Sequence, residues 1–161
     1  MKKTFLFLFF ATFFIVKSQT TFMKIIGSSG NDQFRNIQLT KDKGFIIAAT
    51  TAQSSFIGAY LIKLDSLGDS TWSKIISNQY NTGVQQTKDG GYVLLGNGFK
   101  NSNSGGMTVL KTDSSGNTLW NKIYYDSSNS FSLDYHSSSI KETSDNGFAF
   151  LGTRDPYQGD F

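Results

Sequence analysis

The sequence has no cysteine, one proline and one histidine among its 161 residues. Because cysteine is absent, no disulfide can hold the fold together, and stability has to come from buried apolar surface. Glutamate occurs once, as Glu142, and arginine twice, as Arg35 and Arg154. The residue types from which most catalytic and metal sites are built are therefore scarce.

The first 18 residues differ from the rest in composition. Lys2 and Lys3 form a short basic start, and residues 5–16 are an almost unbroken apolar run. This pattern predicts a signal peptide over residues 1–18, cleaved near Ser18. A transmembrane anchor is the alternative, but the run is shorter than the about 20 apolar residues that span a bilayer. No cysteine follows the run, which excludes a lipid anchor. We expect a secreted or outer-surface chain without a membrane span after cleavage.

Charge is balanced in the remainder of the chain. Of the 15 lysines and arginines, three (Lys2, Lys3 and Lys17) lie in the leader, which leaves 12 against 12 acidic residues. A nucleic-acid-binding domain normally carries a basic patch or stripe. We therefore expect no nucleic-acid partner.

Two short motifs recur along the chain. Thr-x-Asp-x-Gly followed by an aromatic residue occurs at residues 40–45, 87–92 and 143–148. A Lys-x-Asp-x-x-Gly block that leads to a tryptophan occurs at residues 63–72 and 111–120. Recurrence at a spacing of about 50 residues indicates structural units that stack and share a core.

Each unit is expected to contain four short strands, and the third of these is nearly all apolar, which is typical of a strand buried on both faces. The Thr-x-Asp-x-Gly motif predicts a hairpin turn in which glycine supplies a positive φ. The Lys-x-Asp block predicts a second hairpin, which would join the last strand of one unit to the first strand of the next. Trp72 and Trp120, with Phe22 in the same place in the first repeat, are expected between adjacent sheets. The strands of the second repeat are predicted at residues 72–76, 84–87, 91–96 and 107–111.

We therefore predict an all-β fold of tandem four-stranded antiparallel blades, a partial β-propeller of about two and a half to three blades. A β-solenoid or a twisted sandwich is the alternative. The last repeat ends shortly after Gly159, within its fourth strand. We expect a fragment of a longer chain with further blades; the alternative is a naturally short protein that closes by self-association. The predicted repeat region is 19–161, with repeats at about 22–71, 72–119 and 120–161.

Residues 42–50, 61–65 and 89–96 resemble the secreted β-propeller-repeat proteins of Bacteroidetes. In those proteins, Asp-Gly-Gly-Tyr strands alternate with Lys-Leu-Asp turns that precede a tryptophan, and the resemblance covers most of residues 22–161. It implies a propeller fold and export to the cell surface or the medium. Such proteins often carry a C-terminal sorting domain for type IX secretion, and no such domain is recognisable in residues 1–161. The resemblance implies no particular chemistry.

No catalytic constellation is recognisable in the sequence. His136 is expected to be an exposed loop histidine, because no nucleophile-elbow motif surrounds a candidate serine. The spacing from Asp113 to Trp120 does not match a sialidase Asp box, and two arginines cannot form the arginine triad of a sialidase. Residues 113–117 offer oxygens for calcium, but without the EF-hand pattern a hairpin turn is the simpler interpretation. We predict no catalytic residue, metal or cofactor; the alternatives are calcium and a quinone-cofactor enzyme with its active site outside this segment.

The expected loops vary in length between the first and second strands and between the third and fourth strands. Both kinds emerge at the end opposite the Asp-Gly turns, and repeat proteins often bind partners through such loops. The longest loop mixes aromatic and polar residues, which suits an extracellular protein or a glycan, unless the aromatic rings pack beneath it. The predicted function is a non-enzymatic binding scaffold. The alternatives are a fragment of a larger propeller enzyme, either quinone-cofactor-like or a hydrolase, and a structural spacer module. The candidate binding residues are Tyr124, Tyr125, Asp126, Phe131, Asp134, Tyr135 and His136.

Overall fold

The structure is a computed structural model that describes residues 23–53, 56–77, 79–101, 104–124 and 134–155. These residues form ten antiparallel strands and no helix, so the predicted all-β class is confirmed. None of the described segments is a helix that is long and apolar enough to cross a membrane. The strands are β1 (Asn31–Leu39), β2 (Phe45–Gln53), β3 (Phe56–Leu64), β4 (Ser70–Ser77), β5 (Gln79–Gln86), β6 (Tyr92–Asn101), β7 (Ser104–Thr112), β8 (Thr118–Tyr124), β9 (Asp134–Glu142) and β10 (Phe148–Asp155).

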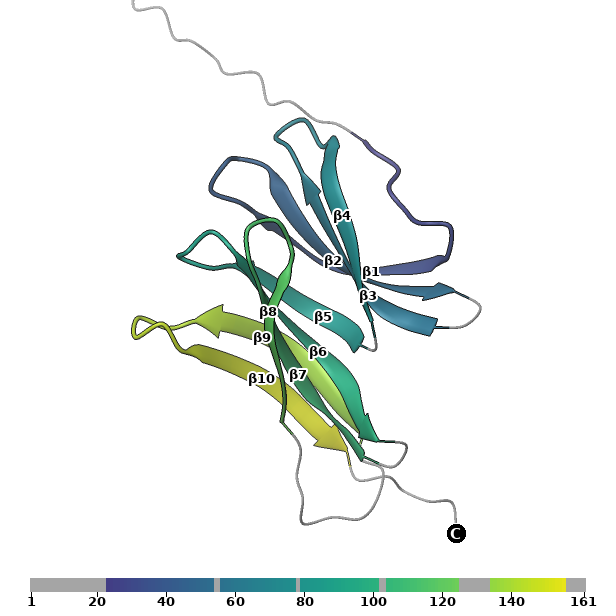
Figure 1. The fold of residues 1–161 in the computed structure, drawn as a ribbon, viewed down its shortest axis with the longest axis vertical. Coiled ribbons are helices and arrows are strands. Elements are labelled where there is room, and N and C mark those ends of the chain that lie inside the picture. Colours follow the sequence, from purple (N-terminus) through teal and green to yellow (C-terminus); the bar gives the residue numbers. More distant parts are fainter. Residues whose placement is uncertain (1–22, 54–55, 78, 102–103, 125–133, 156–161) are drawn as a thin grey trace, which may run out of the picture.

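The strands form three sheets in which chain neighbours are also sheet neighbours. Sheet A has the order β1-β2-β3-β4, and sheet B has the order β5-β6-β7-β8. Sheet C consists of β9 and β10. Figure 1 shows the three sheets stacked in the order A, B, C, with sheet B in the middle.

Apolar side chains fill the spaces between the sheets. Ile46 of β2 meets Val84 of β5 and Leu94 of β6 between sheets A and B, and each is at most 2% exposed. Leu95 of β6 meets Ile140 of β9 between sheets B and C. Since neighbouring residues of a strand point to opposite faces, β6 needs apolar side chains on both faces. This confirms the prediction that the apolar run of the second repeat is buried on both faces.

The two tryptophans lie between sheets, where the sequence places them. Trp72 is half-buried, and its ring centroid lies 5.9 Å from that of Tyr92 in the next sheet. Trp120 is also half-buried and lies 5.8 Å from Phe148 of sheet C. Phe22, the expected equivalent in the first repeat, lies outside the described residues.

The expectation that the Lys-x-Asp hairpin joins two units is wrong. Lys63 of β3 pairs with Trp72 of β4, and Lys111 of β7 pairs with Trp120 of β8, so each hairpin lies within one sheet. The breaks between sheets come after Ser77 and after Tyr124 instead. A repeat period fixes the length of a unit but not its starting point, because every frame of a periodic sequence has the same period.

The connections between strands are shorter than the predicted strand ends imply, because the strands run further than their apolar cores. Gln53 pairs with Phe56, and Asn101 pairs with Ser104, so two residues remain at each of these hairpin tips. A single residue, 78, separates β4 from β5. Backbone pairing continues through polar Ser, Asn and Gly residues because the ladder itself does not need apolar side chains. Between consecutive strands of the described ranges, the longest connection joins β8 to β9.

The glycine of the Thr-x-Asp-x-Gly turn has a different role from the one predicted. Positive φ occurs one residue earlier, at Lys43 (64°), Gly90 (86°) and Asn146 (63°). A Cβ on Gly44 would lie 2.2 Å from the carbonyl oxygen of Leu64, and a Cβ on Gly91 would meet that of Thr112 at the same distance. These glycines are therefore required by the close approach of the next strand.

Candidate functional site

Only part of the predicted binding loop lies among the described residues. Tyr124 ends β8, and its ring is 43% exposed and lies 4.9 Å from that of Phe150. Asp134, Tyr135 and His136 begin β9, where their backbones pair with Asp155, Arg154 and Thr153 of β10. His136 thus belongs to a strand and not to the loop expected for it. Tyr125, Asp126 and Phe131 lie outside the described residues.

Tyr124 borders a groove of about 400 Å³ between sheets B and C, here called the aromatic groove. The ammonium of Lys122 lies 5.4 Å from the ring centroid of Trp120, a geometry typical of a cation–π contact. The rings come from β8 and β10, and the rim includes the turn between β9 and β10. Its lining residues are Val109, Trp120, Lys122, Tyr124, Asn146, Gly147, Phe148 and Phe150.

Beside the groove, the described part of sheet C has two strands, whereas sheets A and B have four each. At the interface between sheets A and B, the turn between β7 and β8 covers Trp72 so closely that a Cβ on Gly116 would lie 2.8 Å from the indole. The same turn is anchored there by Lys74, which donates to the side-chain oxygen of Asn117. Trp120 is the equivalent of Trp72, but the described part of sheet C has no third or fourth strand to cover it.

A polar centre, in which a buried lysine pairs with the turn aspartate, recurs beside the Thr-x-Asp-x-Gly turns of sheets A and B. In sheet A, Asp42 accepts hydrogen bonds from the Thr40 hydroxyl and the Gly44 amide. Its other oxygen lies 2.7 Å from the ammonium of Lys63, which reaches it from β3 and also donates to the Leu64 carbonyl. The lysine side chain is 7% exposed, whereas the aspartate is 61% exposed. The positive charge of the buried lysine is therefore neutralised by the exposed carboxylate of the turn.

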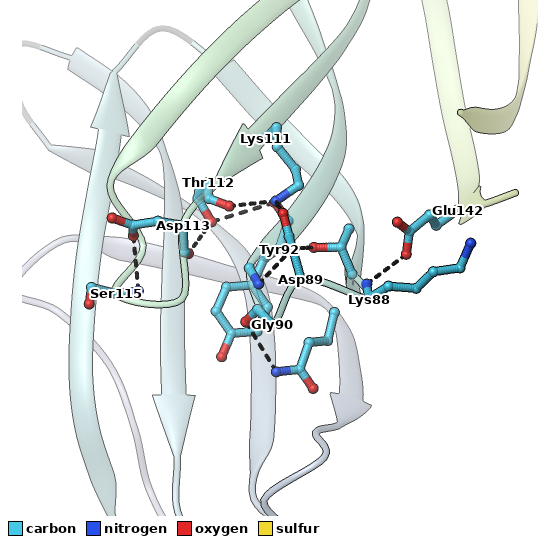
Figure 2. A network of polar contacts seen from close by, with 12 residues as sticks. Lys88, Asp89, Gly90, Tyr92, Lys111, Thr112, Asp113, Ser115 and Glu142 are labelled. Atoms are coloured by element: carbon cyan, nitrogen blue, oxygen red, sulfur yellow. Dashed lines mark hydrogen bonds and ion pairs between the residues drawn. The ribbon is translucent and has the colours of Figure 1, made fainter. Parts of the chain in front are cut away.

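Sheet B repeats this centre with its own residues, as Figure 2 shows. Asp89 accepts from the Thr87 hydroxyl and the Gly91 amide, and one of its oxygens lies 2.9 Å from the ammonium of Lys111. Lys111 also donates to the Thr112 carbonyl at 2.9 Å. In both sheets, the lysine side chain is buried beneath an exposed carboxylate.

The lysines lower the pKa of both carboxyl groups. The hydrogen bond from Lys63, followed by that from Thr40, holds the pKa of Asp42 at about 2. Lys111, followed by Thr87, does the same for Asp89, whose pKa is also about 2. Both carboxylates are about 60% exposed, so water screens much of the attraction.

In sheet C the same turn is present without a lysine. Asp145 accepts from the Thr143 hydroxyl and the Gly147 amide, and these contacts lower its pKa. Within the described ranges, no lysine ammonium lies within ion-pair distance of this carboxylate. Asp145 therefore has the turn geometry of Asp42 and Asp89 without their ion pair.

Lysines also link each turn to the turn of the next sheet. Lys41 donates from its ammonium to the carbonyls of Thr87 and Lys88. Lys88 in turn donates from its ammonium to the carbonyl of Thr143, at 2.7 Å, and from its amide to the carboxylate of Glu142. Figure 2 shows the bond from the Lys88 amide to the Glu142 carboxylate, which reaches from sheet B to sheet C. The turn ends of the three sheets are thus held together by charged side chains.

The residues proposed for calcium form a turn of their own. Asp113 accepts hydrogen bonds from the amides of Ser115 and Asn117, and the side-chain amide of Asn117 donates to its second oxygen. Gly116 has a φ of 77° and so supplies the left-handed residue of this turn. Among the described residues, no three His, Asp or Glu side chains are grouped as metal ligands.

Sequence reasoning did not connect the lysine of one motif with the aspartate of the other. Both recur in each of the first two repeats, which was a usable signal. Recognising that this lysine meets this aspartate requires the strand register. Lys63 lies opposite Ile46 and Lys111 opposite Val93, and each of these partners is the second residue of its strand.

Comparisons with known proteins add no identification. No family model matches the chain, and neither the curated proteins nor the solved structures contain a significant match.

Proposed function

We propose that the chain is an exported, non-enzymatic repeat scaffold of the β-propeller type. The support is the architecture: each four-stranded sheet is a meander, and the first strands β1, β5 and β9 lie beside one another through the stack. The expected leader at residues 1–18 supports export. A propeller would continue this stack around an axis, whereas a solenoid would join neighbouring units by hydrogen bonds between their strands.

The proposed binding surface is the aromatic groove together with the connection from Tyr124 to His136. The observation that carries this proposal is the groove that brings the rings of Trp120, Tyr124 and Phe150 together beside Lys122 and Asn146. Aromatic rings with polar neighbours are typical of recognition sites, because they offer contact area at a small cost in side-chain entropy. We propose an extracellular protein as the partner, and a glycan that stacks on the same rings is the second candidate.

The test compares ligand binding by matched variants of the secreted chain. Wild type is first screened on a defined array of extracellular proteins and glycans. Tyr124→Ser, and in a separate variant the deletion of residues 126–133, should abolish binding to the ligand that wild type retains. Tyr80→Ser is the control, since Tyr80 is similarly exposed, at 38%, on β5. Equal binding by wild type and both groove variants would refute this surface. A hydrolytic or redox activity in the same preparation would favour the enzyme alternative, and no binding at all would favour a spacer.

A further inference from the structure

We propose that the cavity between the turn ends of sheets A and B binds a single uncharged sugar residue, which accepts a hydrogen bond from the Tyr92 hydroxyl. This cavity, here called the turn cavity, is separate from the aromatic groove, which lies between sheets B and C. Its walls belong to the two four-stranded sheets. Binding there does not depend on the aromatic groove or on its ligand.

The turn cavity has the size of a small-molecule site. Its volume is about 650 Å³, and small-molecule sites commonly measure about 300–1,000 Å³. Two turns of sheet A and two turns of sheet B surround it, together with residues at the start of β4 and β6. Ser66 and Ser114, which are exposed, line it from two of these turns, so a ligand can enter from solvent.

Hydrogen bonds between the two sheets hold the cavity in shape. The side chain of Gln86 in sheet B accepts from the Lys41 amide of sheet A and donates to the Gly90 carbonyl of its own turn. The ammonium of Lys41 donates to two backbone carbonyls of the same turn. A cavity whose walls are fixed in advance loses little conformational entropy when a ligand binds.

Tyr92 brings a buried hydroxyl to the cavity. The residue is 2% exposed, and none of the hydrogen bonds among the described residues uses this hydroxyl. Figure 2 shows the ring pointing away from the Lys111–Asp89 pair of its own sheet. Burial, followed by the charge of Asp42 in sheet A, raises the pKa of Tyr92, so the hydroxyl stays protonated at neutral pH. A buried donor without an acceptor is costly, and a ligand oxygen in the cavity would satisfy it.

Packing between the sheets does not require this hydroxyl. The ring centroids of Trp72 and Tyr92 lie 5.9 Å apart, with 62° between the ring planes. At the next interface, those of Trp120 and Phe148 lie 5.8 Å apart, with 59° between the planes. Phenylalanine also occupies this position of the repeat in sheet A, as Phe45. The same ring arrangement therefore forms with phenylalanine, and of the three repeats only the second has tyrosine.

Asp65 adds an acceptor to the cavity. Its Oδ1 accepts from the amides of Leu67 and Asp69, at 2.8 and 2.9 Å. These bonds lower the pKa of Asp65, so the group is ionised at neutral pH. Since both bonds go to Oδ1, Oδ2 is left to accept from a ligand hydroxyl.

The charges around the cavity cancel. Lys63 lies 2.7 Å from Asp42, and the remaining charged groups are Lys41 and Asp65, one of each sign. An ionic ligand would bring a charge that no group of the cavity is left to neutralise. This balance favours an uncharged ligand.

A sugar residue matches these groups. Its hydroxyls both donate and accept, as contact with Tyr92 and Asp65 requires. Its C–H groups suit the half-buried indole of Trp72, because the face of an aromatic ring is the negative part of its quadrupole. The site therefore fits one residue of a glycan and not an extended polymer of charged groups.

The experiment titrates the chain with glucose, galactose, mannose and N-acetylglucosamine and follows the indole signal of Trp72 by NMR. A hexose has about 12 non-hydrogen atoms, so an affinity in the millimolar range is expected for one sugar of this panel. Tyr92→Phe should weaken binding about tenfold, because a ligand oxygen inside the cavity loses its donor. Asp65→Asn should also weaken it, because an amide group replaces the open acceptor while the turn keeps its own.

Matched variants separate this effect from general disruption. Tyr60→Phe removes a hydroxyl from a tyrosine that is 6% exposed on the other face of sheet A. Asp113→Asn alters the same kind of turn in sheet B, where Asp113 accepts from the amides of Ser115 and Asn117. Both variants should bind the sugar as wild type does. Tyr92→Phe should keep the wild-type melting temperature, because phenylalanine serves in the other two repeats.

Two results would overturn the site. They are a panel in which no sugar shifts the Trp72 signal, and a Tyr92→Phe variant that binds as tightly as wild type and Tyr60→Phe. Tighter binding of glucuronate or glucosamine than of glucose would overturn the assignment of an uncharged ligand. Tyr124→Ser should leave the sugar affinity unchanged. If Tyr124→Ser instead abolished it, the sugar would lie in the aromatic groove, and the turn cavity would be wrong while the proposed function stands.

Discussion

The buried lysines provide the sharpest test of how this fold is stabilised. Asp89→Asn keeps the side-chain oxygen that accepts from Thr87 and Gly91, but it removes the negative charge beside Lys111. The lysine side chain is then left 7% exposed beside a neutral amide, with the Thr112 carbonyl at 2.9 Å and the retained side-chain oxygen at 3.1 Å as its remaining partners in the centre. Breaking a fully buried ion pair costs about 3–5 kcal/mol and an exposed one less than about 1 kcal/mol. Since one partner is buried and the other is about 60% exposed, we expect a loss of about 2 kcal/mol.

A double-mutant cycle separates this effect from general disruption. Lys111→Met removes the buried charge together with its desolvation cost, so it should destabilise less than Asp89→Asn does. Adding Asp89→Asn to Lys111→Met should then change little, which gives a coupling energy of about 1–2 kcal/mol. Asp145→Asn is the matched control, because its turn is the same and no lysine pairs with it among the described residues; it should cost less than about 1 kcal/mol.

The assay is urea unfolding of the chain, followed by the fluorescence of Trp72 and Trp120. Free energies of unfolding from the four proteins of the cycle give the coupling directly. Additive losses, or equal losses for Asp89→Asn and Asp145→Asn, would refute the claim that the ion pair stabilises the buried lysine.

Two further predictions concern acid and the turn glycines. The folded pKa of Asp42 and Asp89 is about 2, below the 3.8 of an unperturbed aspartate. Both pairs therefore contribute stability that is complete above about pH 4 and is lost as the pH falls toward about 2. Unfolding free energies from about pH 5 to about pH 2 should show this loss, and Lys63→Met/Lys111→Met should reduce it. An unchanged pH dependence in that variant would contradict the assignment. Gly91→Ala should lower the unfolding free energy by about 2–4 kcal/mol, since its Cβ would lie 2.2 Å from a backbone carbonyl, whereas Gly147→Ala should cost about 1 kcal/mol or less. Equal melting temperatures for the two alanine variants would show that strand approach does not require the glycine.

Local patterns predicted the local structure well. The Thr-x-Asp-x-Gly motif indicated a hairpin turn at residues 40–44, 87–91 and 143–147, and each turn closes by a bond from the threonine amide to the glycine carbonyl. The apolar run at residues 92–95 indicated a strand buried on both faces, and Val93 and Leu94 do face opposite sheets. These signals depend on a few neighbouring residues, so the sequence contains them directly.

Pairing between distant segments was predicted less well. The strand at Trp72 was assigned to the following unit, although it pairs with β3 through the Lys63–Trp72 register. The ion pair between Lys63 and Asp42 was missed for the same reason, because the two residues are brought together only by the register of β2 and β3. Periodicity gives the unit length, whereas register depends on the balance of all cross-strand contacts.

The candidate site was predicted only at its edge. Tyr124 lines the aromatic groove, but Trp120, Phe148 and Phe150 were expected only as core or strand residues. Their place around the groove depends on how sheet C packs against sheet B. No property of the individual side chains carries that information.

The most direct test of the stacked-sheet arrangement is a proton NOESY spectrum of the folded chain with the aromatic rings assigned. We predict cross-peaks between the rings of Trp72 and Tyr92, which join sheet A to sheet B, and between those of Trp120 and Phe148, which join sheet B to sheet C. A folded chain in which the two indoles lack these contacts would contradict the account.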